Sequence, residues 1–257
     1  MEEQAKGEIS FLQLSDTHIL ADDGELLGVR PATQLQRILD RIAGMAITPQ
    51  FCLITGDLVH DSGEAGYHRL RQLLAPITDR GIPLLVGLGN HDQRASFRRG
   101  FLEERTDDNR RYYHARSIGG LRIIVLDSLV PGAVHGELGQ EQLAWLAAEL
   151  RQSAPQGRLI ALHHPIALTG VPWLADNLLR DADALEGVLR GHDIVGILTG
   201  HCHTPSAASF AGTIATTAPS VAFQFTPGTA RMTITGDSGF NFCAIRQRKL
   251  LVTPIYG

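Results

Sequence analysis

Hydrophobic residues along the chain follow two alternating patterns. Short apolar runs, of which residues 9–14 are the first, predict buried β-strands. Between these runs apolar residues recur at every third or fourth position, as at Leu35, Ile38, Leu39 and Ile42, which predicts amphipathic helices. Because alternating strands and helices are typical of βαβ units, we expect an α/β fold with a mainly parallel sheet.

The individual elements before Pro205 can be placed from these patterns. Strands are expected at residues 9–14, 51–55, 84–88, 121–126, 159–162 and 195–198. Helices are expected along the apolar stripes from Leu35 to Ile42 and from Tyr67 to Ile77, and at residues 140–150 and 182–189. Gly81 and Pro83, which follow the second stripe, are signals that end a helix.

The pattern changes after Pro205, where Thr, Ala, Gly and Phe occur in short runs with turn-like residues at 226–228 and 236–239. We expect residues 206–257 to form antiparallel strands and hairpins that complete a second sheet. The chain shows no internal repeat and no long linker, so residues 8–257 are expected to form a single domain. The polar residues 1–7 are expected to be a disordered tail.

Composition and charge narrow the kinds of partner. The 257 residues are 44% hydrophobic, which is enough to bury a large core. The net charge of -4 gives no general attraction to nucleic acid or to an anionic membrane surface. The N-terminus has no signal-peptide pattern, and no apolar run approaches the length that spans a bilayer. We therefore expect a cytoplasmic protein that binds neither polymeric nucleic acid nor membrane.

The three cysteines, Cys52, Cys202 and Cys243, lie far apart and form no Cys-x-x-Cys pair. This spacing argues against both a disulfide framework and a thiolate zinc site. They are expected to be free thiols in a reducing compartment.

Potential metal ligands follow five of the six predicted strands, one small group at the end of each. They are Asp16 and His18, then Asp57, then Asn90 and His91, then His163 and His164, and finally His201 and His203. In an open α/β sheet the carboxyl ends of the strands share one edge, where ligands and catalytic groups collect. Residues that are distant in sequence are therefore expected to be neighbours.

The types of ligand indicate a catalytic rather than a structural metal site. Imidazole, carboxylate and amide oxygen suit iron, manganese or zinc in a hydrolytic site, whereas a structural zinc site is normally closed by thiolates. Cys202 is then a spacer between His201 and His203. In a strand-like ending, side chains alternate, so the thiol would face away from the metals.

The number of ligands points to two ions. About seven ligands are too many for one catalytic metal that keeps a coordination position open, but they suit two ions that share a bridging carboxylate. The glycines at positions 56, 89 and 200 each precede a ligand, and glycine lets a chain turn sharply or approach another group closely.

The motifs Asp-x-His, Gly-Asp, Gly-Asn-His-Asp, His two residues before Pro, and Gly-His-x-His occur in this order over residues 16–203. Together they resemble the calcineurin-like metallophosphoesterase superfamily. The segments GLRIIVLDSLVPGAVHGELGQEQLAWLAAEL and LIALHHPIAL are similar to bacterial class III cyclic nucleotide phosphodiesterases and the related glycerophosphodiesterases. The resemblance implies a four-layer α/β/β/α sandwich of two mixed β-sheets flanked by helices, often dimeric.

The resemblance also implies a role for each candidate residue. The first metal would be held by Asp16, His18 and His203, the second by Asn90, His163 and His201, and Asp57 would bridge them. His91 would be a histidine that is not a ligand but approaches the phosphate and assists the leaving group. His163 is selected over His164 because it lies two residues before Pro165.

Some positions keep alternative interpretations. This branch often has two prolines after the paired histidines, whereas Ile166 follows Pro165 here, so the loop 166–178 and the substrate pocket are expected to differ. Trp173 in that loop is expected to stack on a base, to contact a dimer partner or to pack within the loop. The histidines without a partner pattern are expected on the surface or in the core; they are His60, His68, His114, His135 and His192. For His135 a place at the rim of the site is the alternative, because its loop could reach it.

These observations predict a dinuclear metal-dependent phosphodiesterase, in which a hydroxide that bridges two Mn, Fe or Zn ions attacks a small phosphodiester. A cyclic nucleotide such as cAMP is the favoured substrate, and a homodimer is expected. The alternatives are a glycerophosphodiesterase or another small-diester or monoester phosphoesterase. A nuclease is disfavoured because no basic tract could follow a nucleic-acid backbone. A scaffold that only binds partners would be expected to lose metal-binding histidines.

Overall fold

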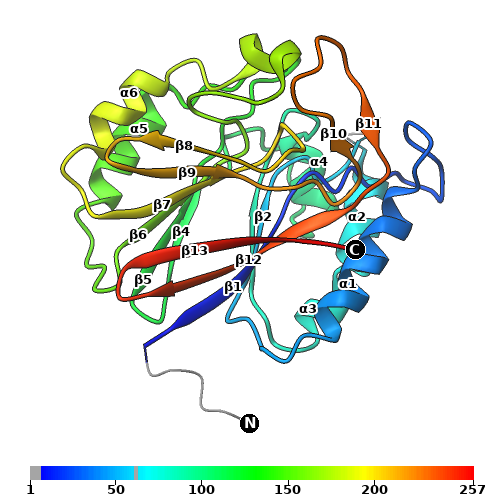
Figure 1. Ribbon diagram of the computed structural model, residues 1–257, viewed down its shortest axis with the longest axis horizontal. Helices are drawn as coiled ribbons and strands as arrows, with labels where there is room; N and C mark the ends of the chain where they lie inside the picture. The colour runs from blue at the N-terminus through cyan, green and yellow to red at the C-terminus, as the bar shows by residue number, and fades with distance from the viewer. Residues whose placement is uncertain (1–6, 61–62) are drawn as a thin grey trace.

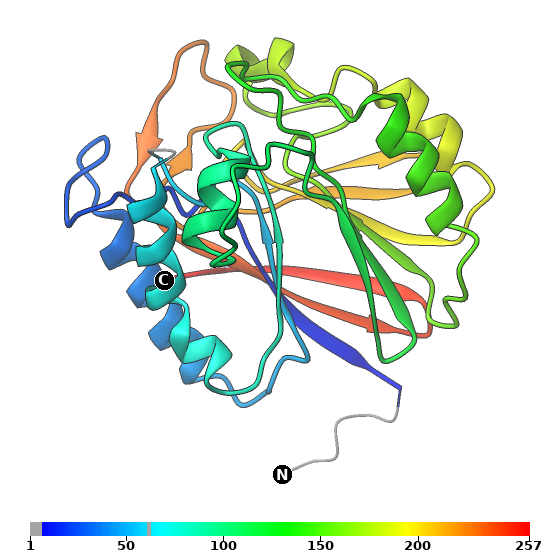
Figure 2. The ribbon, with the colours of Figure 1, turned by 180° about the vertical axis from the view of Figure 1, so that it is seen from behind.

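The computed structural model describes residues 7–60 and 63–257. Its frame is two mixed β-sheets that face each other, with helices on the outer face of each (Figures 1 and 2). The five-stranded sheet has the order β13-β12-β1-β2-β3. In it β1 (Ile9–Leu14), β2 (Cys52–Thr55) and β3 (Leu84–Gly87) are parallel, and β12 (Gly239–Arg246) and β13 (Lys249–Tyr256) are added antiparallel.

The six-stranded sheet has the order β4-β5-β6-β7-β9-β8. Four central strands are parallel: β5 (Leu121–Val125), β6 (Arg158–Ala161), β7 (Ile194–Thr199) and β9 (Thr213–Thr217). The edge strands β4 (His114–Ile118) and β8 (Ser206–Phe210) are antiparallel to their neighbours. A short separate pair is formed by β10 (Gln224–Phe225) and β11 (Ile234–Thr235).

Helices on the five-stranded sheet are α1 (Pro31–Ala43), α2 (Glu64–Leu73), α3 (Ala75–Thr78) and α4 (Arg94–Gly100). Helices α5 (Gly139–Glu149) and α6 (Ala182–Leu189) cover the six-stranded sheet, and η1 (Pro172–Asn177) is a 3₁₀ helix in the loop between β6 and α6. Among the described residues no helix is both long and apolar enough to cross a bilayer.

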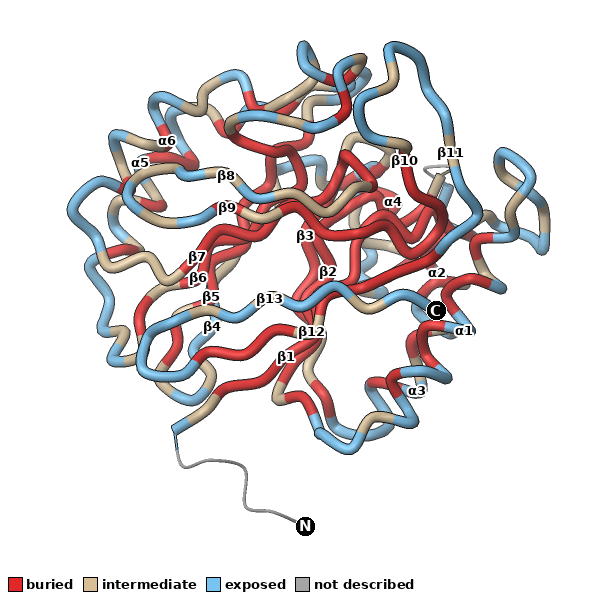
Figure 3. The backbone as a smooth tube through the Cα atoms, in the orientation of Figure 1, coloured by how far each residue is buried: buried red, intermediate tan, exposed pale blue. Residues whose placement is uncertain are grey.

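Side-chain alternation along the strands produces the layers. Leu12 and Leu14 of β1 pack against the helices, whereas Phe11 packs in the core between the sheets. The other sheet repeats this division, because Ile124 of β5 faces α5 and α6 while Ile123 faces the other sheet. Burial on both faces explains why these strands are continuous apolar runs, and the central strands are buried along most of their length (Figure 3).

The structure confirms the predicted four-layer α/β/β/α arrangement, and the predicted strands agree with it to within one or two residues. The stripe from Tyr67 to Ile77 is not one helix, because α2 ends at Leu73 and α3 begins at Ala75. Pro76, the second residue of α3, has a ring and a missing N–H that interrupt a continuous helix. Neither β4 nor α4 was predicted. The first is a half-exposed edge strand and the second is short and rich in arginine, so both lack a strong apolar pattern.

The C-terminal region differs from the expectation that it completes one sheet. Strands β8 and β9 join the six-stranded sheet, whereas β12 and β13 join the five-stranded sheet beside β1. Strand β9 is also parallel to β7 rather than antiparallel. Pairing partners far away in the sequence, which local patterns do not report, determine this division. The expected disordered tail lies outside the described residues except for Gly7.

Candidate metal centre

The predicted ligands lie in loops at the carboxyl ends of five strands. Strands β1, β2 and β3 of one sheet deliver Asp16, His18, Asp57, Asn90 and His91, and strands β6 and β7 of the other deliver His163, His201 and His203. The sequence predicted a shared edge of one sheet. The structure instead forms the site where the edges of two sheets meet, and all these residues are buried except Asn90 and His91, which are half-buried.

The backbone is left-handed at five of these positions. Asp16, His18, Asp57, His201 and His203 have φ between 44° and 71°. Residues other than glycine seldom adopt this region, and such strain clusters at functional sites. Backbone hydrogen bonds between the loops hold it, for example Asp16 N–H to the Gly56 carbonyl and His18 N–H to the Asp57 carbonyl, both 3.0 Å.

This backbone also places Cys202. Strand alternation does not explain its orientation, because β7 ends at Thr199 and the residues that follow are bends. The thiol packs in an apolar cluster with Val171 and Phe223 and accepts a hydrogen bond from Thr169 Oγ1 at 3.1 Å. The Cys202 thiol therefore faces away from the metal ligands, as predicted. The bends after β7 and this apolar packing orient it, rather than the alternation of a strand.

A first group of ligand atoms belongs to Asp16, His18, Asp57 and His203, all within 4.8 Å of one another. His203 Nε2 lies 3.3 Å from Asp16 Oδ1, and His18 Nε2 lies 3.6 Å from Asp57 Oδ2. The two Nε2 atoms are 3.1 Å apart. Two imidazoles and two carboxylates turned toward one point form a suitable donor set for a transition metal.

A second group shares Asp57 with the first. His163 Nε2 lies 3.4 Å from Asp57 Oδ2 and 3.1 Å from Asn90 Oδ1. His201 Nδ1 lies 2.8 Å from the same Asn90 oxygen and 3.2 Å from His163 Nε2. Oδ2 of Asp57 thus faces both groups, which is the position of a bridging carboxylate.

Hydrogen bonds to backbone carbonyls orient the imidazole rings of His163 and His203 for metal binding. His163 Nδ1–H donates to the Thr55 carbonyl at 2.8 Å, and His203 Nδ1–H donates to the Phe223 carbonyl at 2.9 Å. In a neutral imidazole this leaves the Nε2 lone pair directed into the site. The Nε2 of His201 is buried and has no hydrogen-bond partner in the described part of the chain, so only its Nδ1 faces the second group.

Electrostatics keep the carboxylates ionised. Burial raises the pKa of Asp57, but the imidazoles of His163 and His18 outweigh it and hold that pKa well below its usual value. Burial disfavours charge on His163, yet the Asp57 carboxylate raises the pKa of that imidazole to about 9. For His201, burial and then the neighbouring His163 lower the pKa to about 3. Ionised carboxylates and neutral imidazoles are the forms that bind a metal, which must displace the proton on His163.

His164 is held by other contacts. Its Nδ1 lies 2.7 Å from Ser128 Oγ and its Nε2 lies 3.0 Å from the Val134 carbonyl, so both ring nitrogens have a protein partner. The ring lies within metal-ligand distance of His163 and His201, but neither nitrogen is left for a metal. This arrangement supports the choice of His163 over His164 as the ligand.

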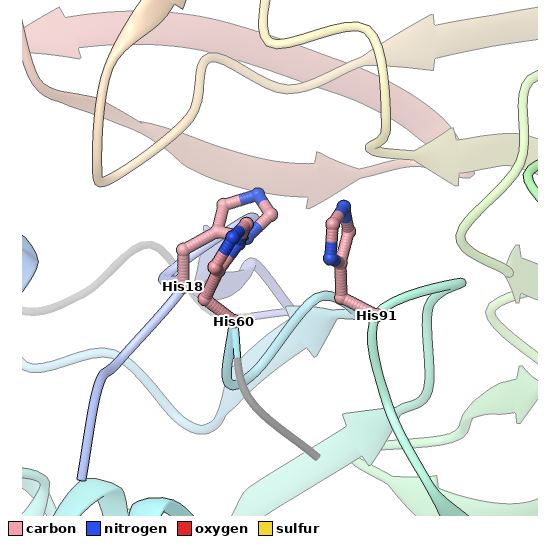
Figure 4. A group of neighbouring side chains, drawn as sticks. All are labelled: His18, His60 and His91. Carbon is pink, nitrogen blue, oxygen red and sulfur yellow. The ribbon is translucent and has the colours of Figure 1, made fainter. Parts of the chain in front are cut away.

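His91 lies beside the first group without joining it. Its backbone N–H donates to Asp57 Oδ1 at 2.9 Å, which leaves Oδ2 for the two groups. The half-buried imidazole contacts the rings of His18 and His60, with centroids 5.0 Å and 4.8 Å away (Figure 4). His91 lines the same pocket as His18, Asp57 and Asn90.

An apolar pocket of about 320 Å³ opens onto the ligands. Apart from the histidines, Asp57 and Asn90, its lining is apolar and comes from several loops: Leu26, Leu27, Val134, Trp173, Leu174, Phe223, Phe225 and Met232. Trp173 packs edge-on against Phe225, with ring centroids 4.7 Å apart. In the loop that was expected to reach the rim, Val134 lines the pocket, and His135 is not part of the lining.

A larger groove of about 830 Å³ lies elsewhere, between β7, β9 and β13. Its charged residues are Arg248 and Lys249, and it contains none of the predicted site residues. Size therefore does not identify the functional site here, whereas the ligand chemistry does.

Several supporting residues were not predicted. Asp92 is buried and accepts hydrogen bonds from Gly89 N–H at 2.8 Å, Leu58 N–H at 3.2 Å and Tyr67 Oη–H at 2.9 Å, so it joins the loops after β2 and β3. Burial and the nearby Asp57 raise the pKa of Asp92 to about 7. The only signal in the sequence was its place at the end of the Gly-Asn-His-Asp motif.

A buried polar network lies between the strands that carry the ligands. Gln13 Nε2 donates to Thr55 Oγ1 at 3.2 Å and to the Thr199 carbonyl at 3.0 Å, while Asn241 Nδ2 donates to Gln13 Oε1 at 2.9 Å. Gln13 thus connects β1, β2 and β12 of one sheet with β7 of the other. In the sequence, the position of the polar Gln13 within the apolar run of β1 was the feature that could have indicated this network.

Comparisons with known proteins agree with this geometry. The sequence model of the calcineurin-like phosphoesterase family matches residues 9–205. The chain is 39% identical over 212 residues to the cAMP/cGMP dual specificity phosphodiesterase of Mycobacterium tuberculosis, covering 82% of this chain and 66% of the relative. It is 31% identical over 228 residues to the 3',5'-cyclic adenosine monophosphate phosphodiesterase CpdA of Pseudomonas aeruginosa, covering 88% of this chain and 81% of the relative.

Solved structures support the fold. Purple acid phosphatase from yellow lupin (Lupinus luteus) seeds superposes with a TM-score of 0.65 at 13% identity, covering 96% of this chain and 51% of that chain. This chain therefore spans about two thirds of the mycobacterial relative and about half of the plant phosphatase.

Proposed function

The chain belongs to the calcineurin-like phosphoesterase family, and from this premise we propose that it is a metal-dependent phosphodiesterase that hydrolyses a cyclic nucleotide. The observation that carries the proposal is the pair of ligand groups that share Asp57 at the base of an apolar pocket. Two relatives that match most of this chain are named as cyclic nucleotide phosphodiesterases, which supports the same substrate class.

In this proposal Asp16, His18 and His203 hold one ion, Asn90, His163 and His201 hold the other, and Asp57 lies between them. Two bound ions of Mn, Fe or Zn supply charge neutralisation for the phosphate oxygens and a water of lowered pKa as the nucleophile. The carbonyls of Thr55 and Phe223 keep His163 and His203 in the tautomer that binds metal.

The remaining residues position the diester and assist departure of the leaving group. His91 lies on the pocket side of His18, and its imidazole N–H donates a proton to the departing oxygen. Its backbone N–H fixes Asp57, so one residue couples the orientation of the carboxylate to that of the proton donor. The apolar lining excludes water from the phosphate, which strengthens these interactions.

The pocket favours a nucleotide over a smaller diester. Trp173, Phe223 and Phe225 place aromatic surface beside the ligands, and a purine or pyrimidine base buries its faces well against such surface. A glycerol group has no aromatic face to pack against these three side chains. A glycerophosphodiester is therefore the second substrate class to test.

Hydrolysis of bis(p-nitrophenyl) phosphate by metal-stripped protein reloaded with Mn²⁺ tests the activity, followed by cAMP, cGMP and a glycerophosphodiester. Asn90→Ala removes the amide oxygen that contacts His163 and His201, and we expect it to lower kcat by at least about 100-fold. Asn109→Ala, at an exposed position, is the matched control and should keep full activity. A metallated wild type that leaves every diester intact would contradict the proposal and favour a partner-binding role.

A homodimer and a cytoplasmic location remain predictions from the resemblance and the sequence. Light scattering that gives the mass of one 27.9 kDa chain at working concentration would remove the dimer from the proposal.

A further inference from the structure

His60 was expected on the surface or in the core, but it lies against the first ligand group. Strands β1 and β2 continue to pair beyond their ends through a parallel bridge between Ile19 and Val59. The backbone N–H of His60 donates to the Ile19 carbonyl at 3.1 Å, which brings its side chain beside His18. The ring lines the pocket together with His18 and His91 (Figure 4).

Three of the four ligand histidines, His18, His163 and His203, turn Nε2 toward the other ligands, whereas His201 turns Nδ1 toward them. His163 and His203 each donate Nδ1–H to a backbone carbonyl and turn Nε2 toward the ligands. His18 also turns Nε2 inward, 3.6 Å from Asp57 and 3.1 Å from His203. Its Nδ1 faces a side chain rather than a carbonyl, and that side chain is His60, with the two Nδ1 atoms 3.5 Å apart.

The tautomers follow from this arrangement. A neutral imidazole has one N–H and one lone pair. If Nε2 of His18 is to bind an ion, its Nδ1 must carry the hydrogen, and the nearby Nδ1 of His60 then accepts it. A partner of this kind fixes the orientation of a ligand ring and raises its basicity.

We propose that His60 is a positioning residue that holds His18 in its metal-binding orientation, an inference that rests on the proposed function of this site. The role is support rather than ligation, because His60 is not one of the four residues whose ligand atoms gather within 4.8 Å of one another around Asp57 in the described structure. Among residues 7–60 and 63–257, the potential ligand atoms of His60 group with those of His18 and His91.

His60 supports His91 as well. The two rings stack with centroids 4.8 Å apart and an interplanar angle of 27°. One side chain therefore contacts both a ligand of the first ion and the proton donor. We expect its loss to lower kcat more than it raises KM, because the substrate would still bind in the apolar pocket.

The test is calorimetric titration of Mn²⁺ into metal-free wild type, His60→Leu and His60→Asn, with circular dichroism to verify folding. Leucine fills space but accepts no hydrogen bond, whereas asparagine places Oδ1 near the position of Nδ1. We expect His60→Leu to weaken one of two Mn²⁺ sites by about 10- to 100-fold. His60→Asn should recover most of that affinity. His68→Leu, an exposed histidine on α2, is the matched control and should bind as wild type does.

The outcomes separate the inference from the proposed function. Wild type that binds fewer than two ions would refute the dinuclear site itself. Two wild-type sites that are unchanged in His60→Leu would overturn the role of His60. Equal weakening in the leucine and asparagine variants would overturn the acceptor role and indicate that His60 ligates the ion directly.

Discussion

At the scale of single residues, the site depends on positions where the backbone takes an uncommon conformation or leaves no room for a side chain. Five ligand residues have positive φ, and glycines lie against several of them. A Cβ built on Gly89 would lie 2.2 Å from Asp57 Oδ1 and 2.8 Å from His163 Cε1. Local strain is therefore maintained by contacts between loops that are distant in sequence.

Gly89→Ala should displace the Asp57 carboxylate or the loop after β3, because real Cβ atoms do not approach other atoms so closely. We expect kcat for bis(p-nitrophenyl) phosphate to fall by about 100-fold or more, since small misplacements of catalytic groups have effects of this size. Gly187→Ala in α6 has open space around its Cβ and serves as the control with unchanged activity. A fully active, metal-replete Gly89→Ala variant would show that the loop adjusts without consequence.

At the scale of elements, the ends of the strands carry chemistry and their interiors hold those ends in register. Gln13 is fully buried within β1, yet its amide binds Thr55 of β2, Thr199 of β7 and Asn241 of β12. The loops that follow β1, β2 and β7 carry Asp16, Asp57 and His201. The network thus joins the two sheets directly behind the ligands, where an apolar side chain could not link them.

Gln13→Leu should destabilise the protein by about 1 to 3 kcal/mol for each buried group that it leaves unpaired. Asn241 Nδ2 loses its acceptor, whereas the Thr199 carbonyl keeps a hydrogen bond from Ala218 N–H at 2.9 Å. Urea denaturation of Gln13→Leu, Asn241→Leu and the double variant measures the coupling between the two side chains. The double variant should lose less stability than the sum of the single variants, and strict additivity would show that the pair does not act together.

Hydrophobic patterns predicted the buried central strands but not every element of the fold. Strands such as β1 and β7 were placed correctly because burial on both faces produces continuous apolar runs. Strand β4 and helix α4 were missed because each has weak local periodicity and is defined by its neighbours. The apolar stripe continues across the break between α2 and α3, which lies at Pro76, so hydrophobic periodicity alone does not reveal it.

At the scale of the whole molecule, the two sheets must be assembled before either ligand group exists. Asp57 lies in a loop of one sheet, and its partners His163 and His203 lie in loops of the other. The unfolded chain therefore does not hold these ligands together, and ions that bind the native site should stabilise the folded state.

Removal of bound metal should lower the temperature of unfolding. Mn²⁺ at a free concentration of 100 times Kd stabilises the native state by about 2.7 kcal/mol per site. For a chain of this size that corresponds to an increase of roughly 5 to 10 °C per site, or about 10 to 20 °C for two sites, measured by differential scanning calorimetry with Mn²⁺ against EDTA. Asp57→Asn should lose most of this increase, because the shared carboxylate contacts both groups. An identical unfolding temperature with and without metal would argue against a native dinuclear site.

Local patterns along the chain were sufficient to predict the α/β class, the positions of the central strands and the candidate ligands at their ends. These properties depend on local periodicity and on motifs in which residue type and spacing carry the chemistry. The tertiary structure decided that the ligands come from two sheets, which atom of each histidine faces the site, and that His60, Asp92 and Gln13 support it. Each of these features depends on contacts between residues far apart in the chain, so the order of hydrophobic and polar residues could not specify them.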